Sequence, residues 1–327
     1  MLGLLNPLTA IKRYQSLAKQ GILGMNKRNH RYIARYNARS LYPVVDDKLL
    51  TKELALEYTL TTPDLIGTVD NQHDVGRIKS LIVGHNGFCI KPSKGSGGKG
   101  ILVVHASDGN RFQKANGEWL DLDDVQRHVS NILAGLFSLG GASDVAMIES
   151  LLSPSAALSE YSYQGVPDIR VIVFRGIPIM AMMRLACTAS NGKANLHQGA
   201  IGVGLDMATG RAIQAVQKEQ CISHHPDTNV LLSDLKVPGW QKLLELACAC
   251  YEICGLGYLG VDLVIDEKTG PTLLELNARP GLSIQIANGV GLLPRLDRVE
   301  GLRKPELMAV DAKIAFAQEH FSSEFTD

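Results

Sequence analysis

The sequence predicts an α+β fold of two subdomains, each an antiparallel sheet with packed helices. Its 327 residues exceed the roughly 150 expected of one domain, and 45% are hydrophobic against 20% charged, as in globular proteins. Short β-rich segments follow one another in pairs, and single helical stretches separate the pairs instead of alternating with every strand. The expected strands are residues 88–92, 101–105, 145–150, 169–174, 178–186, 200–206, 260–266 and 271–277.

Apolar residues at helical spacing predict the helices. The first expected helix, over residues 46–60, ends at residues 61–65, because the residue before Pro63 avoids the helical conformation. The expected helices are residues 46–60, 74–86, 121–137 and 239–255. We therefore expect a basic helical arm over 1–45, an N-terminal subdomain over 46–145, a C-terminal subdomain over 146–300 and a helical tail over 301–327.

The charge is balanced overall but not along the chain. Lys and Arg number 33 and so do Asp and Glu, which argues against a strongly basic nucleic-acid binder. Residues 1–45 contain no acidic residue, whereas the rest has 25 basic and 33 acidic residues. We favour a solvated basic helix; the arm could instead dock on the acidic body or bind an acidic partner, a phosphate or a membrane surface. Its basic residues are Lys12, Arg13, Lys19, Lys27, Arg28, Arg31, Arg35 and Arg39.

The apolar segments are short, and the cysteines point to a reducing compartment. No segment approaches the ~18 consecutive apolar residues of a membrane span, and residues 1–5 are too short for the core of a signal peptide. None of the six cysteines forms a C-x-x-C pair. Cys250 and Cys254 would share one helix face, where a metal site is conceivable, but burial in the core is the favoured interpretation. We expect a cytoplasmic protein.

A glycine-rich loop is the first stretch that indicates chemistry. It runs from Lys91 through Gly95, Ser96, Gly97 and Gly98 to Gly100, between two predicted strands. Glycines expose backbone N–H groups and tolerate positive φ, so such a loop can surround phosphate oxygens. The alternative is a glycine hairpin without a ligand.

Better-known glycine motifs do not fit this loop. Gly95, Gly97 and Gly100 match G-x-G-x-x-G, but a strand follows where a dinucleotide-binding motif requires a helix. Neither Ser nor Thr follows Lys99, which excludes a P-loop. In protein kinases the lysine follows the glycine loop, whereas Lys91 precedes this one, and H-R-D and D-F-G are absent from the sequence.

Residues 260–277 predict a hairpin with polar side chains on one face. Symmetric pairing about Lys268-Thr269 sets Asp262 opposite Glu275, and Asn277 shares their face because strand side chains alternate. Two carboxylates and an amide suit Mg²⁺, which binds few protein oxygens together with substrate phosphates. The alternative is a surface of solvated acids. The same register sets Val264 opposite Leu273 and Asp266 opposite Pro271, and turns Val261, Leu263, Ile265, Leu274 and Leu276 to the other face.

The phosphate loop preceded by Lys91, followed by a Glu-x-Asn strand, resembles the ATP-grasp carboxylate–amine ligases. The likeness covers residues 46–297 and is greatest to the RimK-type α-L-glutamate ligases and related proteins. It implies two subdomains that clasp ATP, with Mg²⁺ or Mn²⁺ as the metal. Glu149 and the backbone near Leu152 would contact adenine. The resemblance implies ATP binding by Lys48, Lys91, Gly95, Ser96, Gly97, Gly98, Glu149 and Leu152, and metal binding by Asp262, Glu275 and Asn277.

Catalytic residues are also implied by the resemblance. Asp168-Ile169-Arg170 matches the family's D-I-R strand, and Arg184 matches an arginine on the following strand; structural ion pairs are the alternative for both arginines. Residues 195–199 match an N-L-H-x-G loop, in which Asn195 and His197 would position the acyl acceptor. The chain departs from the family in its short segment before Lys48, in lacking an acidic ribose ligand just after Leu152, and in Arg279, where glutamate ligases have a small residue.

The resemblance implies an ATP-dependent ligase that joins a carboxylate to an amine through an acylphosphate. A non-catalytic ATP-binding module and a small-molecule phosphotransferase are the alternatives. Small molecules or peptides would supply the carboxylate and the amine, and the protein would form a homo-oligomer.

Overall fold

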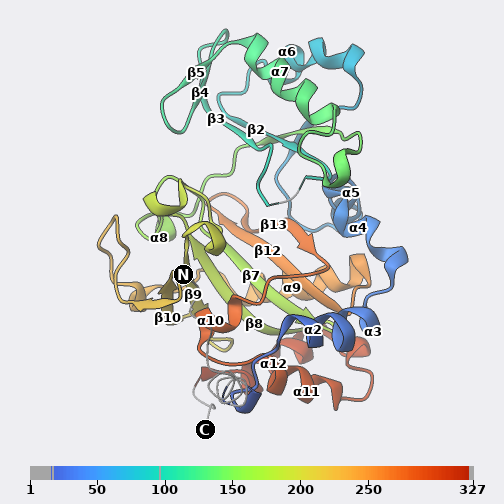
Figure 1. The fold of residues 1–327 in the computed structure, drawn as a ribbon, viewed down its shortest axis with the longest axis vertical. Coiled ribbons are helices and arrows are strands. Elements are labelled where there is room, and N and C mark those ends of the chain that lie inside the picture. Colours follow the sequence, from blue (N-terminus) through green and yellow to red (C-terminus); the bar gives the residue numbers. More distant parts are fainter. Residues whose placement is uncertain (1–15, 17, 96, 324–327) are drawn as a thin grey trace, which may run out of the picture.

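The computed structural model describes residues 16, 18–95 and 97–323, whose strands form two antiparallel sheets (Figure 1). The first sheet has the order β1-β6-β2-β3-β4-β5, made of Leu65–Val69, Ala146–Ser150, Phe88–Pro92, Leu102–Ser107, Phe112–Lys114 and Trp119–Leu120. The second has the order β11-β10-β9-β8-β7-β12-β13, made of Gln220–Ile222, Ala212–Gln217, Ile201–Leu205, Ile177–Leu185, Asp168–Phe174, Tyr258–Asp266 and Gly270–Asn277. The predicted α+β class is therefore confirmed.

Helices pack on both sheets and bridge the space between them. The α-helices are α2 Met25–Lys27, α3 Ala34–Tyr36, α4 Pro43–Asp46, α5 Lys48–Glu57, α6 Ile78–Ile82, α7 Leu122–Leu133, α8 Ala156–Ser159, α9 Trp240–Cys254, α10 Ile284–Asn288, α11 Leu293–Glu300 and α12 Val310–His320. A π-helix spans Arg28–Ile33, and 3₁₀ turns span Arg39–Leu41, Gln72–Arg77, Leu139–Gly141, Thr188–Ser190, Leu196–Gln198, Leu232–Asp234 and Pro305–Leu307. In Figure 1, α6 and α7 lie with the first sheet, α9 to α12 lie with the second, and α4 and α5 lie beside their junction.

All eight predicted strands are present, with ends within two residues of the prediction. The predicted helix over 46–60 is divided into α4 and α5 by Asp47, whose extended backbone makes it the N-cap of α5. The predicted helix over 74–86 is partly 3₁₀ and ends at Ile82. The strands β1, β4, β5, β10 and β11 were not predicted, because most of them are too short to show alternation.

The predicted boundary between the subdomains, at residue 145, is misplaced. β6 begins at Ala146 but lies inside the first sheet, between β1 and β2, where Cys89 pairs with Glu149. The chain leaves that sheet only after Ser150. Both edges of β6 are already paired, one with β1 and the other with β2, so β6 cannot belong to the second sheet.

The N-terminal arm docks on the C-terminal subdomain. The ring of Tyr32 is fully buried and meets Phe174 edge-on at 5.6 Å between centroids. Arg31 forms ion pairs of 2.9 Å with Asp297 and 2.6 Å with Glu300 on α11. The expected solvated helix is thus wrong for this part of the arm. Lys12 and Arg13 lie outside the described residues.

The cysteines for which the sequence left a metal site open lie in the core of the C-terminal subdomain. Cys248, Cys250 and Cys254 are buried on α9, which confirms core packing. Burial raises the pKa of the Cys250 thiol well above its usual value, so it stays protonated. Across residues 16, 18–95 and 97–323, no helix has both the length and the apolar character needed to cross a membrane.

Asn37 fastens the arm to β12 and to the residue that follows β13. Its amide donates to the carbonyl oxygens of Tyr258 (2.8 Å) and Ala278 (3.1 Å) and accepts from the Tyr258 N–H (2.8 Å). We expect Asn37→Ala to lower the free energy of unfolding by about 2–4 kcal/mol, because three buried backbone groups lose their partner. Urea unfolding measures this. The exposed Asn26→Ala on α2 is the control and should change stability by less than about 0.5 kcal/mol; equal values for the two variants would contradict the assignment.

Candidate active site

The β12–β13 hairpin brings the predicted metal ligands together. Asp262 pairs with Glu275 as predicted, but a β-bulge follows, and Leu263 then pairs with Leu273. The predicted pairs of Val264 with Leu273 and of Asp266 with Pro271 are therefore wrong. Leu274 is the additional residue of the bulge, so Leu273 is buried in the core where the sequence predicted Leu274.

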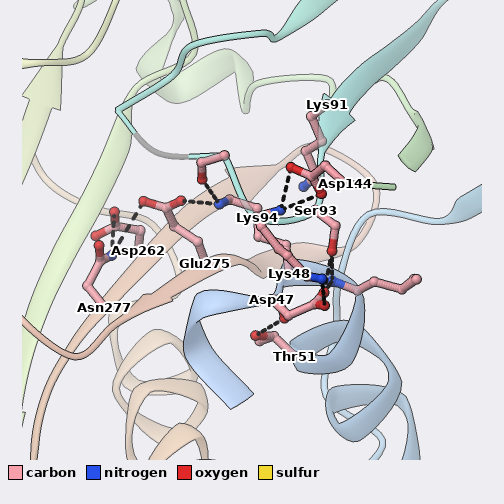
Figure 2. A network of polar contacts seen from close by, with 12 residues as sticks. Asp47, Lys48, Thr51, Lys91, Ser93, Lys94, Asp144, Asp262, Glu275 and Asn277 are labelled. Carbon is pink, nitrogen blue, oxygen red and sulfur yellow. Dashed lines mark hydrogen bonds and ion pairs between the residues drawn. The ribbon is translucent and has the colours of Figure 1, made fainter. Parts of the chain in front are cut away.

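Asp262, Glu275 and Asn277 converge on one point (Figure 2). The Asn277 amide nitrogen lies 3.3 Å from an oxygen of Asp262 and 3.4 Å from an oxygen of Glu275. Two anionic oxygens thus face a common position that attracts positive charge. Asp262 is only 2% exposed, which contradicts the alternative of a solvated acidic surface.

Two arginines hold the buried end of this group. Arg170 donates to both oxygens of Asp262, with a distance of 2.7 Å from Nε to Oδ1. Arg184 donates to Asp168 and lies 2.9 Å from Asp262. Burial raises the pKa of Asp262, but both guanidinium groups outweigh it and hold that pKa well below its usual range. Burial raises the pKa of Asp168 to about 7 against the opposing effect of Arg184. Of the two neighbouring carboxylates, Asp168 and Asp262, Asp168 is therefore the first to be protonated as the pH falls.

Lys48 connects the glycine loop with the β12–β13 hairpin. It is the first residue of α5, and its ammonium donates to the Gly95 carbonyl at 2.6 Å and lies 3.6 Å from Glu275. The Asp47 side chain caps the same helix by accepting from the backbone of Leu49. This cap fixes the first turn of α5, and with it the position of Lys48, at the junction of the subdomains (Figure 2).

The glycine loop has the backbone that its sequence requires. Gly97 and Gly98 are exposed and have φ of +64° and +72°, which other residues rarely adopt. A Cβ atom at Gly95 would lie 2.2 Å from the Pro92 ring. Ser96, predicted to bind ATP, lies outside the described residues.

Glu149 lies between two lysines. One carboxylate oxygen is 2.6 Å from the Lys91 ammonium, and the other is 2.8 Å from that of Lys52. Burial raises the pKa of Glu149, but the two lysines outweigh it and lower the pKa below its usual value. Burial also lowers the pKa of Lys91, but Glu149 reverses that shift and raises it. The resemblance assigned the Glu149 side chain to adenine; here its oxygens face the two lysines.

Lys52 is a site residue that the sequence patterns did not reveal. It lies one helical turn after Lys48 and also contacts Thr62 and the Pro63 carbonyl. Burial lowers its pKa, partly offset by Glu149. The available signal was a lysine four residues after Lys48, on a face that packs inward. Both lysines line a small cleft between the subdomains, together with Thr51, Thr62, Pro63, Lys91, Glu149, Leu273 and Leu274.

The remaining predicted residues lie at the edges of this arrangement. Leu152 lies in the connection that leaves β6 toward the larger sheet, where the next residue, Ser153, donates its N–H to Asp266. Asn195 and His197 lie in the loop between β8, which carries Arg184, and β9. Asn195 caps its own 3₁₀ turn and His197 is exposed, and no hydrogen bond among the described residues joins either of them to the predicted metal ligands.

The donor set fits a magnesium ion shared with a nucleotide. No cluster of three or more His, Cys, Asp or Glu side chains suited to a metal occurs in the described chain. A closed metal cage is thus absent from this part. Two carboxylates and an amide that can turn its oxygen inward suit Mg²⁺, which takes its other ligands from phosphates and water.

A protein-family model decides the family. The model described as "Sugar-transfer associated ATP-grasp" matches residues 27–301, which is most of the chain. The protein belongs to this ATP-grasp family. The predicted ATP-grasp fold is thereby confirmed. The greater likeness to RimK-type glutamate ligases stays a prediction, and no curated protein sequence matches the chain.

Solved structures similar to this ATP-grasp protein are distant in sequence. The ATP-grasp ligase PsnB, complexed with a phosphomimetic precursor variant, Mg and ADP, is 14% identical (TM-score 0.44, 85% of this chain and 61% of PsnB). The D-alanine–D-alanine ligase of Bacillus anthracis complexed with ATP is 14% identical (TM-score 0.43, 84% of this chain and 66% of the ligase). The biotin carboxylase domain of the Hydrogenobacter thermophilus 2-oxoglutarate carboxylase is 15% identical (TM-score 0.46, 81% of this chain and 47% of the carboxylase chain). The chain therefore spans about 61% of the length of PsnB.

Glu149→Gln tests the buried lysine–glutamate group. We expect it to lower the free energy of unfolding by about 3–5 kcal/mol at pH 7, because two buried ammonium groups lose their counter-charge. The pKa of Glu149 is depressed in the folded protein, so its stabilisation is complete above the unfolded-state value of about 4.3 and is lost as pH falls through the folded value.

The difference between this variant and the wild type should therefore shrink below about pH 4. Urea unfolding over a pH series measures it, with Glu53→Gln as the control because Glu53 is exposed on the same helix as Lys52. A difference that stays constant from pH 7 to pH 3 would contradict the ion-pair assignment.

Proposed function

We propose that this protein is an ATP-dependent ligase that joins a carboxylate to an amine through an acylphosphate. The observation that carries the proposal is the position of Lys48, which bonds to the glycine loop on one side and faces Glu275 on the other. A triphosphate lying between the loop and the hairpin would meet Lys48, Lys91 and the proposed metal ligands at once. Membership of an ATP-grasp family supports the same placement.

The proposed reaction needs charge neutralisation more than covalent chemistry. A substrate carboxylate would attack the γ-phosphate of ATP, releasing ADP and forming an acylphosphate, and an amine would then displace phosphate to form an amide. Mg²⁺ bound by Asp262, Glu275 and Asn277 would neutralise phosphate charge. We propose that Lys48 and Lys91 bind the phosphates, with Lys52 and Glu149 holding Lys91 in place.

Arg170 and Arg184 have a structural task in this proposal. Both donate to Asp262, so they hold its oxygens toward Glu275 and Asn277. Because Asp262 is paired with both arginines, Arg170 can turn part of its hydrogen bonding toward a substrate anion while Arg184 still neutralises Asp262. We assign the loop of Asn195 and His197 to the substrates, because it leaves the strand that carries Arg184.

The family description favours a sugar-bearing substrate. It associates its members with sugar transfer, so we propose that the acid or the amine belongs to a sugar or a sugar-linked molecule. The resemblance to RimK-type enzymes makes glutamate the first free acid to test. We place the reaction in the cytoplasm.

Amine-dependent turnover separates the ligase from its alternatives. We expect ADP to form when an acid and an amine are both supplied, from a panel of amino acids, peptides, amino sugars and sugar acids. A coupled ADP assay measures it, and mass spectrometry should show the amide. Turnover with an acid alone would favour a phosphotransferase, and ATP binding without turnover for any pair would favour a non-catalytic module.

Glu275→Gln tests the metal site without disturbing the arginines. Asp262 neutralises Arg170 and Arg184, so its removal also threatens folding, whereas Glu275 is 35% exposed. We expect Glu275→Gln to lower kcat by about 10²–10³-fold, since one preorganised charge is lost. Asp311→Asn, at an exposed position of α12, should leave the rate unchanged. Wild-type turnover in the Glu275 variant would refute the metal assignment.

A further inference from the structure

The two ends of the glycine loop are fixed by one continuous segment, residues 128–145, which lies outside the candidate active site. This segment comprises the second half of α7 and the chain that leads into β6. It supplies a buried carboxylate at one end of the loop and a histidine at the other. Both are polar side chains that the proposed chemistry leaves without a task.

Asp144 holds the beginning of the loop. Its carboxylate is 3% exposed and accepts the Lys94 N–H at 2.9 Å, the Val145 N–H at 2.8 Å and the Ser138 hydroxyl. Gly95 forms a β-bridge with Ser138. The chain therefore turns toward the proposed phosphate site from a point held by a buried anion.

His128 holds the end of the loop. Its Nε2 lies 2.9 Å from the carbonyl oxygen of Gly100. The Phe137 ring lies 5.6 Å from the imidazole and packs so closely that a Cβ atom at Gly100 would be 2.4 Å from it. Gly100 also has φ of +73°, so this position requires glycine for two independent reasons.

The protonation of His128 follows from its partner. A carbonyl oxygen only accepts, so Nε2 must carry the hydrogen. Burial lowers the pKa of His128 and Lys114 lowers it further, against the Gly100 carbonyl, so the ring is neutral at pH 7. The Nε2–H is present in the neutral and the charged ring alike, so this anchor does not depend on pH.

We propose that His128 and Asp144 are positioning residues that set the glycine loop against the terminal phosphates of ATP. The proposal rests on the proposed function, because it takes the loop to bind phosphate. Neither side chain would touch the nucleotide. Their loss should therefore weaken contacts made by the loop and leave contacts with adenine and ribose intact, which a general loss of structure would not do.

The test compares nucleotides that differ in their phosphates. Binding of ATP and of adenosine is measured by calorimetry for the wild type, His128→Ala and His128→Gln, with the exposed His105→Ala on β3 as the control. We expect His128→Ala to weaken ATP binding about tenfold and adenosine binding less than about twofold. Glutamine keeps an N–H at the position of Nε2, so His128→Gln should recover most of the ATP affinity.

A second variant covers the case that His128→Ala does not fold. Asp144→Asn keeps the shape of the side chain but replaces one acceptor oxygen with a donor, and should weaken ATP binding with the same sparing of adenosine. Equal losses for ATP and adenosine, or wild-type ATP affinity in both variants, would overturn this inference alone. A wild-type protein that binds no ATP would overturn the proposed function and this inference with it.

Discussion

Buried charge is the constraint on which this structure depends. Asp262 lies between Arg170 and Arg184, and Glu149 lies between Lys91 and Lys52. A buried carboxylate is costly unless it is paired, so each anion dictates where its two cations lie. Because those cations come from different strands and from α5, the pairing also fixes how these elements meet. The site is thus held by the same interactions that would neutralise its ligand.

Helix α5 converts this constraint into a connection between the subdomains. Its capped first turn directs Lys48 to the loop of the first sheet and to Glu275 of the second, and the next turn directs Lys52 to Glu149. A helix places residues four apart on one face, so a single rigid element sets both contacts. The docked N-terminal arm leads directly into α4 and α5, which ties the position of this helix to the core of the larger subdomain.

Local sequence signals predicted the strands well and predicted the connections between subdomains poorly. The β-branched runs and turn residues located eight strands because alternation and turn chemistry act over a few residues. The prediction of a boundary at residue 145 was wrong because β6 pairs with β2 and β1, which lie nearly 60 and 80 residues away in the sequence. The predicted β12–β13 register was wrong beyond Asp262 because a bulge depends on packing across the sheet, which periodicity does not encode.

The sequence by itself determined the α+β class, the glycine loop and the convergence of Asp262 with Glu275 and Asn277. Each of these follows from local backbone preference or from the two-residue period of a strand. Only the tertiary structure decided that Lys52 and Glu149 form one buried group, that Asp144 and His128 hold the loop, and that the arm docks through Tyr32 and Asn37. Such contacts join distant residues, and it is the shared cost of burying polar groups, not any local pattern, that selects them.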